Sequence, residues 1–350
     1  MRIAFFVNSI KGESPNYSTT HLALCALSRG HEIYYVTPGD FVLRPDDSLV
    51  IRALCLPARN YKKAETLFKD LQGKETMITT LDVSEIDVLM LRNDPSEDAA
   101  DRPWAAHVGA VFGRLAAARG VIVLNDPDGL AKAQNKLYFQ DFPASVRPET
   151  LIAKSIEEIR AFIDKQKKGV ILKPLQGSGG KNVFKIASAK DANIKQIFEA
   201  VSEEGYLIAQ SYMPAAVEGD VRLFLMNGLP LQRDGEYAAL RRAPASGEIR
   251  SNIHAGGQAG TVEVTATMRA IAETVRPKLI QDGMFLVGLD IVGDKLLEIN
   301  VYTPGGLNNL SKLYGVDFPL SVVEALEKKV EIRDKYSDGQ GLSNRELATL

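Results

Sequence analysis

The sequence predicts an α/β protein that begins with a doubly wound, parallel-sheet domain and continues into antiparallel sheet. Three segments near the start alternate as strand, helix and strand, at Arg2–Val7, His21–Arg29 and Glu32–Val36, and this order builds parallel sheets. Near the other end, two apolar runs, Phe285–Val292 and Leu296–Val301, flank a short turn and indicate a β-hairpin. A chain of 350 residues is long enough for two or three domains, each with its own core.

Composition is typical of an ordinary soluble globular protein. Hydrophobic residues make up 45% and charged residues 25%, and the net charge of -2 favours neither nucleic acid nor an anionic membrane as a partner. The longest mostly apolar segment, residues 105–124, is interrupted by Arg114 and Arg119, so we expect no membrane span. The opening apolar stretch is too short for a signal peptide, and the only cysteines are Cys25 and Cys55. Both observations favour a cytoplasmic location.

The segment after the first strand argues against a dehydrogenase. A dinucleotide-binding domain carries G-x-G-x-x-G there, whereas residues 8–13 read NSIKGE. The further elements predicted for this domain are strands at 48–55, 88–91 and 121–124 and helices at 64–71 and 104–119. A polar run, Arg92-Asn93-Asp94-Pro95, follows the strand at 88–91, and ligands bind at such carboxyl ends in open α/β sheets. A plain strand-to-turn transition explains that run equally well.

A glycine-rich loop joins two predicted strands in the middle of the chain. The loop, PLQGSGGKN at residues 174–182, lies between strands at 169–173 and 182–186. It is no Walker A loop, because an Asn follows Gly180-Lys181 and Leu175 stands where that motif needs a glycine. Glycines let successive N–H groups point into a concavity that binds phosphate, although such a loop alone is weak support. Lys173 strengthens the phosphate prediction, since a partly apolar strand has little use for a lysine without an anion nearby.

The second half of the chain places helices and strands around a basic segment. Helices are predicted at 157–166, 194–203, 267–281 and 318–329, and strands at 206–212 and 223–226. Residues 241–257 combine small residues with arginines, which suits a lid that carries positive charge over an anionic substrate, and we expect residues 243–255 to be mobile without ligand. A solvated surface loop is the alternative. We expect residues 336–350 to be polar and poorly anchored.

Three polar residues, Asp290, Glu298 and Asn300, interrupt the apolar runs of the hairpin. A three-residue loop at Gly293–Lys295 would pair the last residue of the first run with Leu296 and place Asp290 opposite Glu298. Asn300 then joins the same face, because side chains alternate along a strand. Opposed carboxylates with Cβ atoms about 5 Å apart repel, and a hard divalent cation turns that repulsion into attraction. An exposed face with solvated acids is the alternative.

Six short motifs mark the chain between residues 125 and 301. They are Asn125-Asp126-Pro127 with Lys136, ILKPLQGSGGKNVF at 171–184, AQSYMP at 209–214, EGDVR at 218–222, IRSNIHAGG at 249–257 and VGLDIVGDKLLEINV at 287–301. Together they resemble the ATP-grasp superfamily, and most closely the bacterial type of glutathione synthetase. The resemblance is good over residues 85–325 and loose over the first 80.

The resemblance implies a fold and a reaction. In ATP-grasp proteins two antiparallel-sheet subdomains, here 126–213 and 214–330, clasp ATP; residues 1–125 would form a Rossmann-like substrate domain and 331–350 a polar tail. A substrate carboxylate is phosphorylated to an acyl phosphate, and an amine then attacks to give an amide, ADP and phosphate. In this family the acid is γ-glutamylcysteine and the amine is glycine. The implied cofactors are ATP with Mg²⁺, or Mn²⁺ in its place, and the implied assembly is a homo-oligomer.

The resemblance also implies roles for individual residues. The residues expected around the ATP phosphates are Lys136, Lys173, Gly177, Ser178, Gly179 and Gly180. The hinge expected to hold adenine, largely through backbone groups, is Gln210, Ser211, Tyr212 and Met213. The expected metal ligands are Asp290, Glu298 and Asn300. The catalytic groups expected to face the acyl phosphate are Arg222, Arg242, Arg250 and Asn252. The expected substrate-binding residues are Arg92, Asp220, Arg222, Thr303, Gly305 and Gly306, with Asp220 positioning either Arg222 or a substrate amine.

Two other functions remain open. One is an ATP-grasp ligase that acts on a different acid and amine, such as a peptide or cell-wall precursor pair. The run YTPGGLNN at 302–309 departs from the family's Thr-Ser-Pro-Thr type run at the place where substrate is chosen. The other is a catalytically inactive nucleotide-binding module, against which the intact lysines and acidic residues argue. The sequence has no G-x-S-x-G motif, so a serine hydrolase finds no support.

Overall fold

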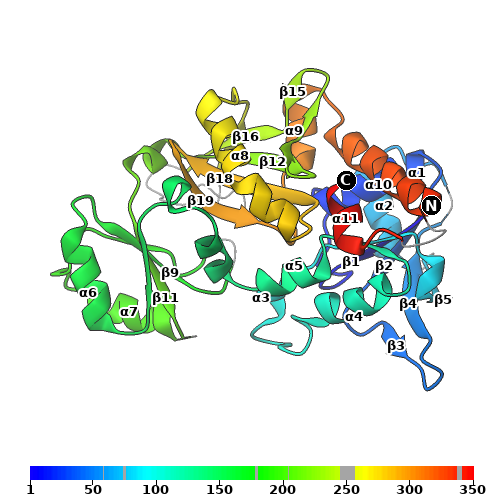
Figure 1. The fold of residues 1–350 in the computed structure, drawn as a ribbon, viewed down its shortest axis with the longest axis horizontal. Coiled ribbons are helices and arrows are strands. Elements are labelled where there is room, and N and C mark those ends of the chain that lie inside the picture. The colour runs from blue at the N-terminus through cyan, green and yellow to red at the C-terminus, as the bar shows by residue number, and fades with distance from the viewer. Residues whose placement is uncertain (58, 74–75, 178–179, 204, 245–256, 337–340) are drawn as a thin grey trace.

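The computed structural model describes residues 1–57, 59–73, 76–177, 180–203, 205–244, 257–336 and 341–350. In this part of the chain the strands form sheets of seven, four and six strands and one two-stranded ribbon, β14 (Gln232–Arg233) with β15 (Glu236–Tyr237). Figure 1 shows the seven-stranded sheet at one end, the six-stranded sheet in the middle and the four-stranded sheet at the other end. The structure therefore has the expected parallel-sheet beginning and antiparallel continuation.

The seven-stranded sheet is built around four parallel strands: β2 (Glu32–Val36), β1 (Arg2–Phe6), β6 (Val88–Leu91) and β7 (Ile122–Leu124). Alternate residues of β1 enter different cores: Ile3 and Phe5 pack with helix α1 (Ser18–Ser28), and Ala4 and Phe6 with residues of helix α4 (Val108–Ala117). Helices therefore cover both faces, as a doubly wound sheet requires.

The sequence prediction found strand 48–55 of this sheet but missed its two antiparallel partners. There β4 (Leu49–Cys55) pairs with β3 (Phe41–Leu43) and β5 (Met77–Asp82), beside the predicted helix α2 (Ala64–Leu71). Most side chains of β5 are only half-buried or exposed, so it lacks the apolar alternation that reveals a strand in sequence. The helix predicted at 104–119 begins only at Val108, after the short helix α3 (Pro95–Asp98) and a run of turns.

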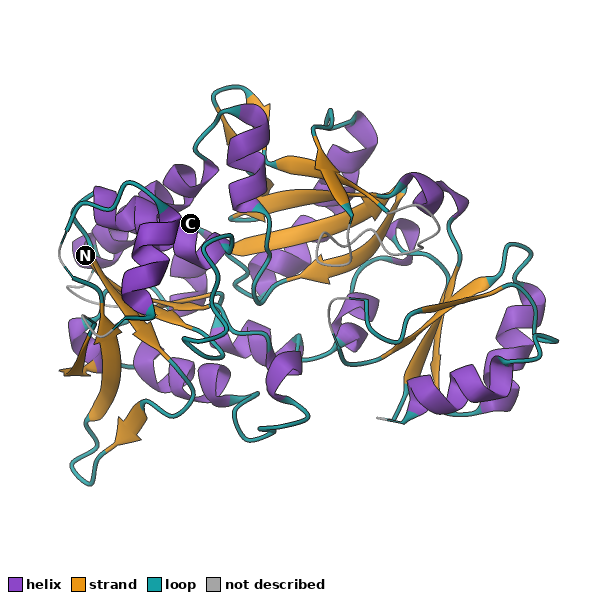
Figure 2. Cartoon of the chain, turned by 180° about the vertical axis from the view of Figure 1, so that it is seen from behind, coloured by secondary structure: helices purple, strands orange, loops and turns teal. Residues whose placement is uncertain are grey.

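The four-stranded sheet has the order β10-β9-β11-β8 and is antiparallel throughout. Its strands are β8 (Thr150–Ala153), β9 (Val170–Pro174), β10 (Phe184–Ile186) and β11 (Leu207–Ser211). Helices α6 (Ile156–Lys165) and α7 (Ile194–Ser202) pack on it and give it a separate hydrophobic core. The view from behind in Figure 2 shows this sheet and its two helices set apart from the rest of the molecule.

The six-stranded sheet has the order β17-β16-β12-β18-β19, with β13 (Leu229–Pro230) also paired to β12. The other strands are β12 (Asp220–Met226), β16 (Ala239–Ala243), β17 (Gln258–Gly260), β18 (Leu286–Val292) and β19 (Lys295–Asn300). Helix α8 (Ala266–Gln281) packs with Leu223 and Leu289, whereas α9 (Leu307–Tyr314) and α10 (Phe318–Lys335) pack with Phe224 and Leu286. Three short helices connect the first sheet to the second: α5 (Pro127–Lys132), η2 (Lys136–Asp141) and η3 (Ala144–Val146). A fourth, η4 (Pro214–Glu218), precedes β12.

The hairpin of β18 and β19 has the predicted outcome but a different turn. Asp290 lies opposite Glu298, as expected, yet Val292 pairs with Lys295 rather than with Leu296. The loop is thus shorter than predicted, and an irregularity in register between Asp290 and Ile291 restores the alignment. An extra residue in one strand shifts every following side chain by one place, which brings the two carboxylates to the same face.

The prediction of a poorly anchored C-terminus was wrong. Helix α10 continues to Lys335, and a further helix, α11 (Asn344–Thr349), begins with a Ser343–Glu346 capping box. Leu347 and Ala348 are buried, and the buried Lys329 ammonium donates hydrogen bonds to the carbonyls of both residues. In the described part of the chain, no helix combines the length and apolar character needed to cross a membrane.

Candidate active site

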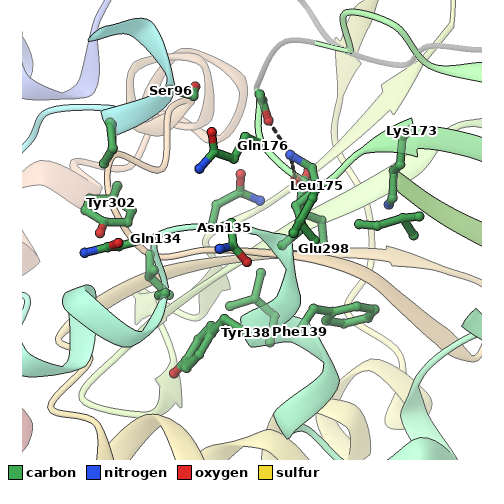
Figure 3. A pocket seen from close by; sticks show the side chains of 18 of the residues that line it. Ser96, Gln134, Asn135, Tyr138, Phe139, Lys173, Leu175, Gln176, Glu298 and Tyr302 are labelled. Atoms are coloured by element: carbon green, nitrogen blue, oxygen red, sulfur yellow. Dashed lines mark hydrogen bonds and ion pairs between the residues drawn. The ribbon is translucent and has the colours of Figure 1, made fainter. Parts of the chain in front are cut away.

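A cavity of about 150 Å³ lies where the four-stranded sheet, the β19 edge and the seven-stranded sheet's α3 meet. The predicted site residues that line it are Lys136, Lys173, Gly177, Gln210, Glu298, Asn300 and Thr303. Figure 3 shows Lys173 on one side, Ser96 and Tyr302 on the other, Glu298 between them and Tyr138 and Phe139 beneath. The sequence did not single out Ser96, Gln134, Asn135 or Tyr302, although Asn135 directly precedes a predicted lysine.

Two lysines reach this cavity from different elements. Lys173 lies on β9, where buried and half-buried residues alternate, and its Nζ donates to Gln210 Oε1 at 3.2 Å. Burial lowers the pKa of Lys173 to about 8, against the attraction of Glu298. Lys136 begins η2, and its Nζ donates to the Gly177 carbonyl and lies 3.5 Å from Glu298 Oε1. The two ammonium groups and one carboxylate therefore converge, as an ATP phosphate site requires.

The glycine-rich loop enters the cavity through Gly177, whose φ of 112° is a conformation that glycine adopts without strain. Gly180, with φ of 77°, lies in the turn that follows and does not line the cavity. Ser178 and Gly179 lie outside the described residues. The prediction that all four residues close over phosphates is therefore supported by position for Gly177 and stays a prediction for the others.

The hinge segment at the end of β11 contributes one side chain to the cavity. Gln210 lines it, whereas Ser211 points to the opposite side of the strand, where its Oγ bonds Glu149 O and Gln166 Oε1. The backbone N–H groups of Ser211 and Tyr212 already donate to Glu149 O and Gly169 O. These two N–H groups are thus committed to the sheet, and the Met213 carbonyl accepts from the Ala216 N–H. That residues 210–213 hold adenine through their other backbone groups stays a prediction.

The three predicted metal ligands lie together on the hairpin but differ in their surroundings. Both oxygens of Asp290 accept hydrogen bonds from Arg222, at 2.8 and 2.7 Å, and Asn300 Nδ2 donates to Asp290 at 3.2 Å. Glu298 faces the cavity with its side chain 37% exposed. The described residues contain no cluster of three or more His, Cys, Asp or Glu side chains. Two carboxylates with one amide oxygen nevertheless fit Mg²⁺, which takes few protein ligands and completes its shell with water and phosphate.

The buried Arg242, the half-buried Arg222 and two buried aspartates, Asp220 and Asp290, form a charged cluster at the hairpin. Arg242 bonds Asp220 through Nε at 2.9 Å and approaches Asp290 Oδ2 at 2.8 Å, and Arg222 pairs with Asp290. Burial alone would raise the pKa of Asp290, but the two guanidinium groups outweigh it and hold that pKa well below its ordinary value. Asp220 was expected to position Arg222 or a substrate amine; its ion pair in the described structure is with Arg242 instead.

Predicted substrate-binding residues from the first and last thirds of the chain also lie close together. Arg92 is buried and donates from Nη2 to the Pro304 carbonyl at 3.3 Å, while Arg222 Nη1 lies 3.4 Å from the next carbonyl, that of Gly305. The Gly306 N–H was expected to be free for a substrate carboxylate, but it donates to Ser18 Oγ at 3.2 Å. Arg250 and Asn252 lie outside the described residues, as does most of the predicted lid, whereas its first three residues, 241–243, belong to strand β16.

The fold and the site define an ATP-grasp ligase, an enzyme that uses ATP with divalent metal ions to join two substrates. Two solved structures share the fold. D-cycloserine synthetase DcsG has a TM-score of 0.62 at 13% identity and covers 94% of this chain and all of its own. D-alanyl-alanine synthetase A from Vibrio cholerae has a TM-score of 0.56 at 11% identity, over 95% of this chain and 98% of its own.

The chain belongs to the prokaryotic glutathione synthetase family. The family's N-terminal domain matches residues 1–131 and its ATP-grasp domain residues 135–315. The glutathione synthetase of Agrobacterium fabrum is 31% identical over 91% of this chain and 93% of its own, and that of Synechococcus elongatus is 32% identical over 94% and 99%. The first 80 residues, expected to match only loosely, are therefore covered by the family's own N-terminal domain.

Proposed function

We propose that this ligase joins γ-glutamylcysteine to glycine, and that ATP is cleaved to ADP and phosphate through an acyl phosphate of the cysteine carboxylate. The observation that carries the proposal is the convergence of Lys136, Lys173 and Glu298 in one cavity, beside a buried arginine cluster. Phosphoryl transfer needs little covalent help from protein; it needs alignment and compensation of negative charge. The site offers both.

On the ATP side, the two lysines would neutralise phosphate oxygens under the loop formed by Gly177, Ser178, Gly179 and Gly180. Adenine would lie against the hinge at 210–213. Asp290, Glu298 and Asn300 would hold Mg²⁺, or Mn²⁺ in its place, and when bound the metal acts as a Lewis acid on the phosphates. Because Asn300 Nδ2 faces Asp290, its ligand atom would be Oδ1.

On the acid side, Arg222 and Arg242 would stabilise the acyl phosphate and the oxyanion that develops when glycine attacks, together with Arg250 and Asn252. Their pairing with aspartates fixes the guanidinium planes before substrate arrives, so little reorganisation is needed. Arg92, Thr303, Gly305 and Gly306 would contact the substrates, the last through its Cα face because its N–H is committed to Ser18 and its carbonyl to the Leu310 N–H.

We assign residues 1–125 to substrate binding, 126–213 to the subdomain over ATP and 214–330 to the subdomain with the metal residues. We further propose a homo-oligomer in the cytoplasm. Met77 and Ile78, 72% and 64% exposed on β5, offer an apolar surface for association, and both cysteines are free thiols. Light scattering of the purified chain tests the assembly: a monomer at all concentrations would exclude it.

Phosphate release with ATP, Mg²⁺ and each substrate omitted in turn tests the reaction. We expect release only when γ-glutamylcysteine and glycine are both present, with glutathione as the product by mass. Release with a different acid and amine alone would sink the glutathione assignment while leaving a ligase. Tight ATP binding without release in any acid–amine panel would mean an inactive module.

A further inference from the structure

Arg92 is a buried guanidinium with only neutral partners. The residue is 5% exposed, and its Nε and Nη2 donate to Thr19 Oγ1 at 3.2 Å and to the Pro304 carbonyl at 3.3 Å. Among the described residues no carboxylate forms an ion pair with it. A buried cation without an anion is costly, and such a group is retained where a ligand supplies the missing charge.

Glu13 presents the complementary situation close by. Its Oε2 is buried without a hydrogen-bond partner in the described structure, and Arg92 is near enough to influence its ionisation although the two do not pair. A carboxylate oxygen can accept more than one hydrogen bond, so a buried oxygen without a partner is an acceptor that a ligand's donor can satisfy.

The loop that carries Glu13 is held against the strand-to-helix connection of the six-stranded sheet. Ser18 Oγ accepts from the N–H groups of Gly306 and Leu307, each at 3.2 Å. Arg92 bonds the neighbouring Pro304 carbonyl, and Thr303 lines the main cavity. Arg92 and the start of the helix that follows the Glu13 loop are therefore both tied to residues 304–307, which directly follow the cavity-lining Thr303.

We propose that Glu13 and Arg92 form a subsite for the α-amino acid head of the acid substrate, with Glu13 accepting hydrogen bonds from its ammonium and Arg92 binding its α-carboxylate. This rests on the proposed function, because γ-glutamylcysteine carries both charges on the carbon atom farthest from its reacting carboxylate. The amine substrate is excluded from the subsite, since an ammonium locked in an ion pair cannot attack an acyl phosphate. Glu13 is thus a specificity-determining residue.

The titration of Glu13 is consistent with this role. Burial raises the pKa of Glu13 to about 7, against the attraction of Arg92 and with a contribution from Glu97. The other titratable groups that face it are the phenols of Tyr17 on the same loop and Tyr35 on β2. A bound ammonium favours the carboxylate, so binding of the acid near pH 6.5 should release a proton, whereas the free enzyme holds it.

The experiment compares γ-glutamylcysteine with glutarylcysteine, which lacks only the α-amino group, in wild type and Glu13→Gln. We expect the KM of wild type to be about 10- to 100-fold higher for glutarylcysteine. Glu13→Gln should raise the KM for γ-glutamylcysteine by a similar factor, leave the KM for ATP and glycine unchanged, and make no further difference to glutarylcysteine. Glu97→Gln, the neighbouring exposed carboxylate, should behave as wild type.

A second readout separates binding from folding and from the choice of reaction. Calorimetry in buffers of different ionisation enthalpy should show proton release when wild type binds γ-glutamylcysteine, and none for Glu13→Gln. Equal loss with both acids, or unchanged proton release in the variant, would overturn the subsite. If wild type does not use γ-glutamylcysteine at all, the proposed function has failed first, and that result is distinct from normal turnover that ignores Glu13.

Discussion

Asp290 and Glu298 face each other across one hairpin, yet the structure treats them differently. Asp290 is 4% exposed and surrounded by Arg222, Arg242 and Asn300. Glu298 keeps 37% of its side chain exposed, and the Lys136 ammonium lies 3.5 Å from its Oε1. The first carboxylate is already neutralised by the protein, whereas the second still has charge to offer a ligand.

The position of each strand in the sheet explains the difference. β18 lies between β12 and β19, so Asp290 has strand neighbours on both sides, and Arg222 is its cross-strand partner on β12. β19 is the edge strand, and Glu298 there faces the cavity rather than another strand. A central carboxylate therefore organises its surroundings, and an edge carboxylate serves the ligand. We expect mutations at the two positions to separate stability from turnover.

Replacing Asp290 should have the largest effect. Asp290→Asn leaves the half-buried Arg222 and the buried Arg242 facing a neutral amide, although Arg242 keeps Asp220, and removing one partner of a buried ion pair typically costs about 3–5 kcal/mol. We expect the free energy of unfolding, measured in urea, to fall by about 3 kcal/mol, and ligase turnover to fall below detection. A variant that keeps wild-type stability would show that the arginines do not depend on Asp290.

Glu298→Gln should affect turnover without affecting folding. The change removes a ligand charge at a half-exposed edge position and preserves shape, so we expect the free energy of unfolding to stay within about 0.5 kcal/mol of wild type. Turnover should fall more than tenfold, about 1.4 kcal/mol, and the Mg²⁺ concentration for half-maximal rate should rise. A smaller loss would mean that Glu298 is not a metal ligand, and the proposed contrast between a structural Asp290 and a ligand-binding Glu298 would then fail.

Gly219→Ala tests whether the position of Arg242, which pairs with Asp290, matters for stability and turnover. Gly219 has φ of 95°, and an added Cβ would collide with the Arg242 carbonyl, so the strand that supplies this arginine must shift. We expect a loss of about 1–3 kcal/mol in the free energy of unfolding, together with reduced turnover and an unchanged affinity for ATP. Gly39→Ala is the matched control, because that glycine has open space around it and no positive φ. If both variants are equally stable, the approach of Gly219 to Arg242 carries no energetic weight.

The hairpin also shows how far sequence reasoning reaches in this molecule. Period-two alternation was enough to predict that Asp290, Glu298 and Asn300 share a face, and the structure confirms it. The turn was predicted with one residue too many, because a register irregularity inside the strand gives the same alignment as a longer loop. The local pattern predicts which residues share a face of the sheet. It does not predict whether a longer turn or a register irregularity within the strand produces that alignment.

Contacts between segments far apart in the chain could not be predicted from the sequence for a different reason. We expected Asp220 to position Arg222, two residues away on the same strand, or a substrate amine. Among the described residues it forms an ion pair with Arg242, which lies directly opposite on β16. The hydrogen bond from the Gly306 N–H to Ser18 Oγ likewise depends on how the first and last thirds of the chain pack. The anchoring of α11 escaped prediction because its buried residues are few and its acceptors are backbone carbonyls.

The smallest expected effect concerns Lys173, which approaches the site from the sheet opposite Glu298. Since burial lowers its pKa to about 8, the ammonium is mostly charged at pH 7 and mostly neutral at pH 9 in the free enzyme. Phosphate favours the charged form, so the affinity for ATP should weaken about tenfold between these pH values, as measured by calorimetry at fixed ionic strength. In Lys173→Arg the guanidinium stays charged throughout, and the dependence should flatten even if the affinity at pH 7 is lower. An equally steep dependence in the variant would assign the titration to another group. The charge of Lys173 would then not contribute to ATP binding.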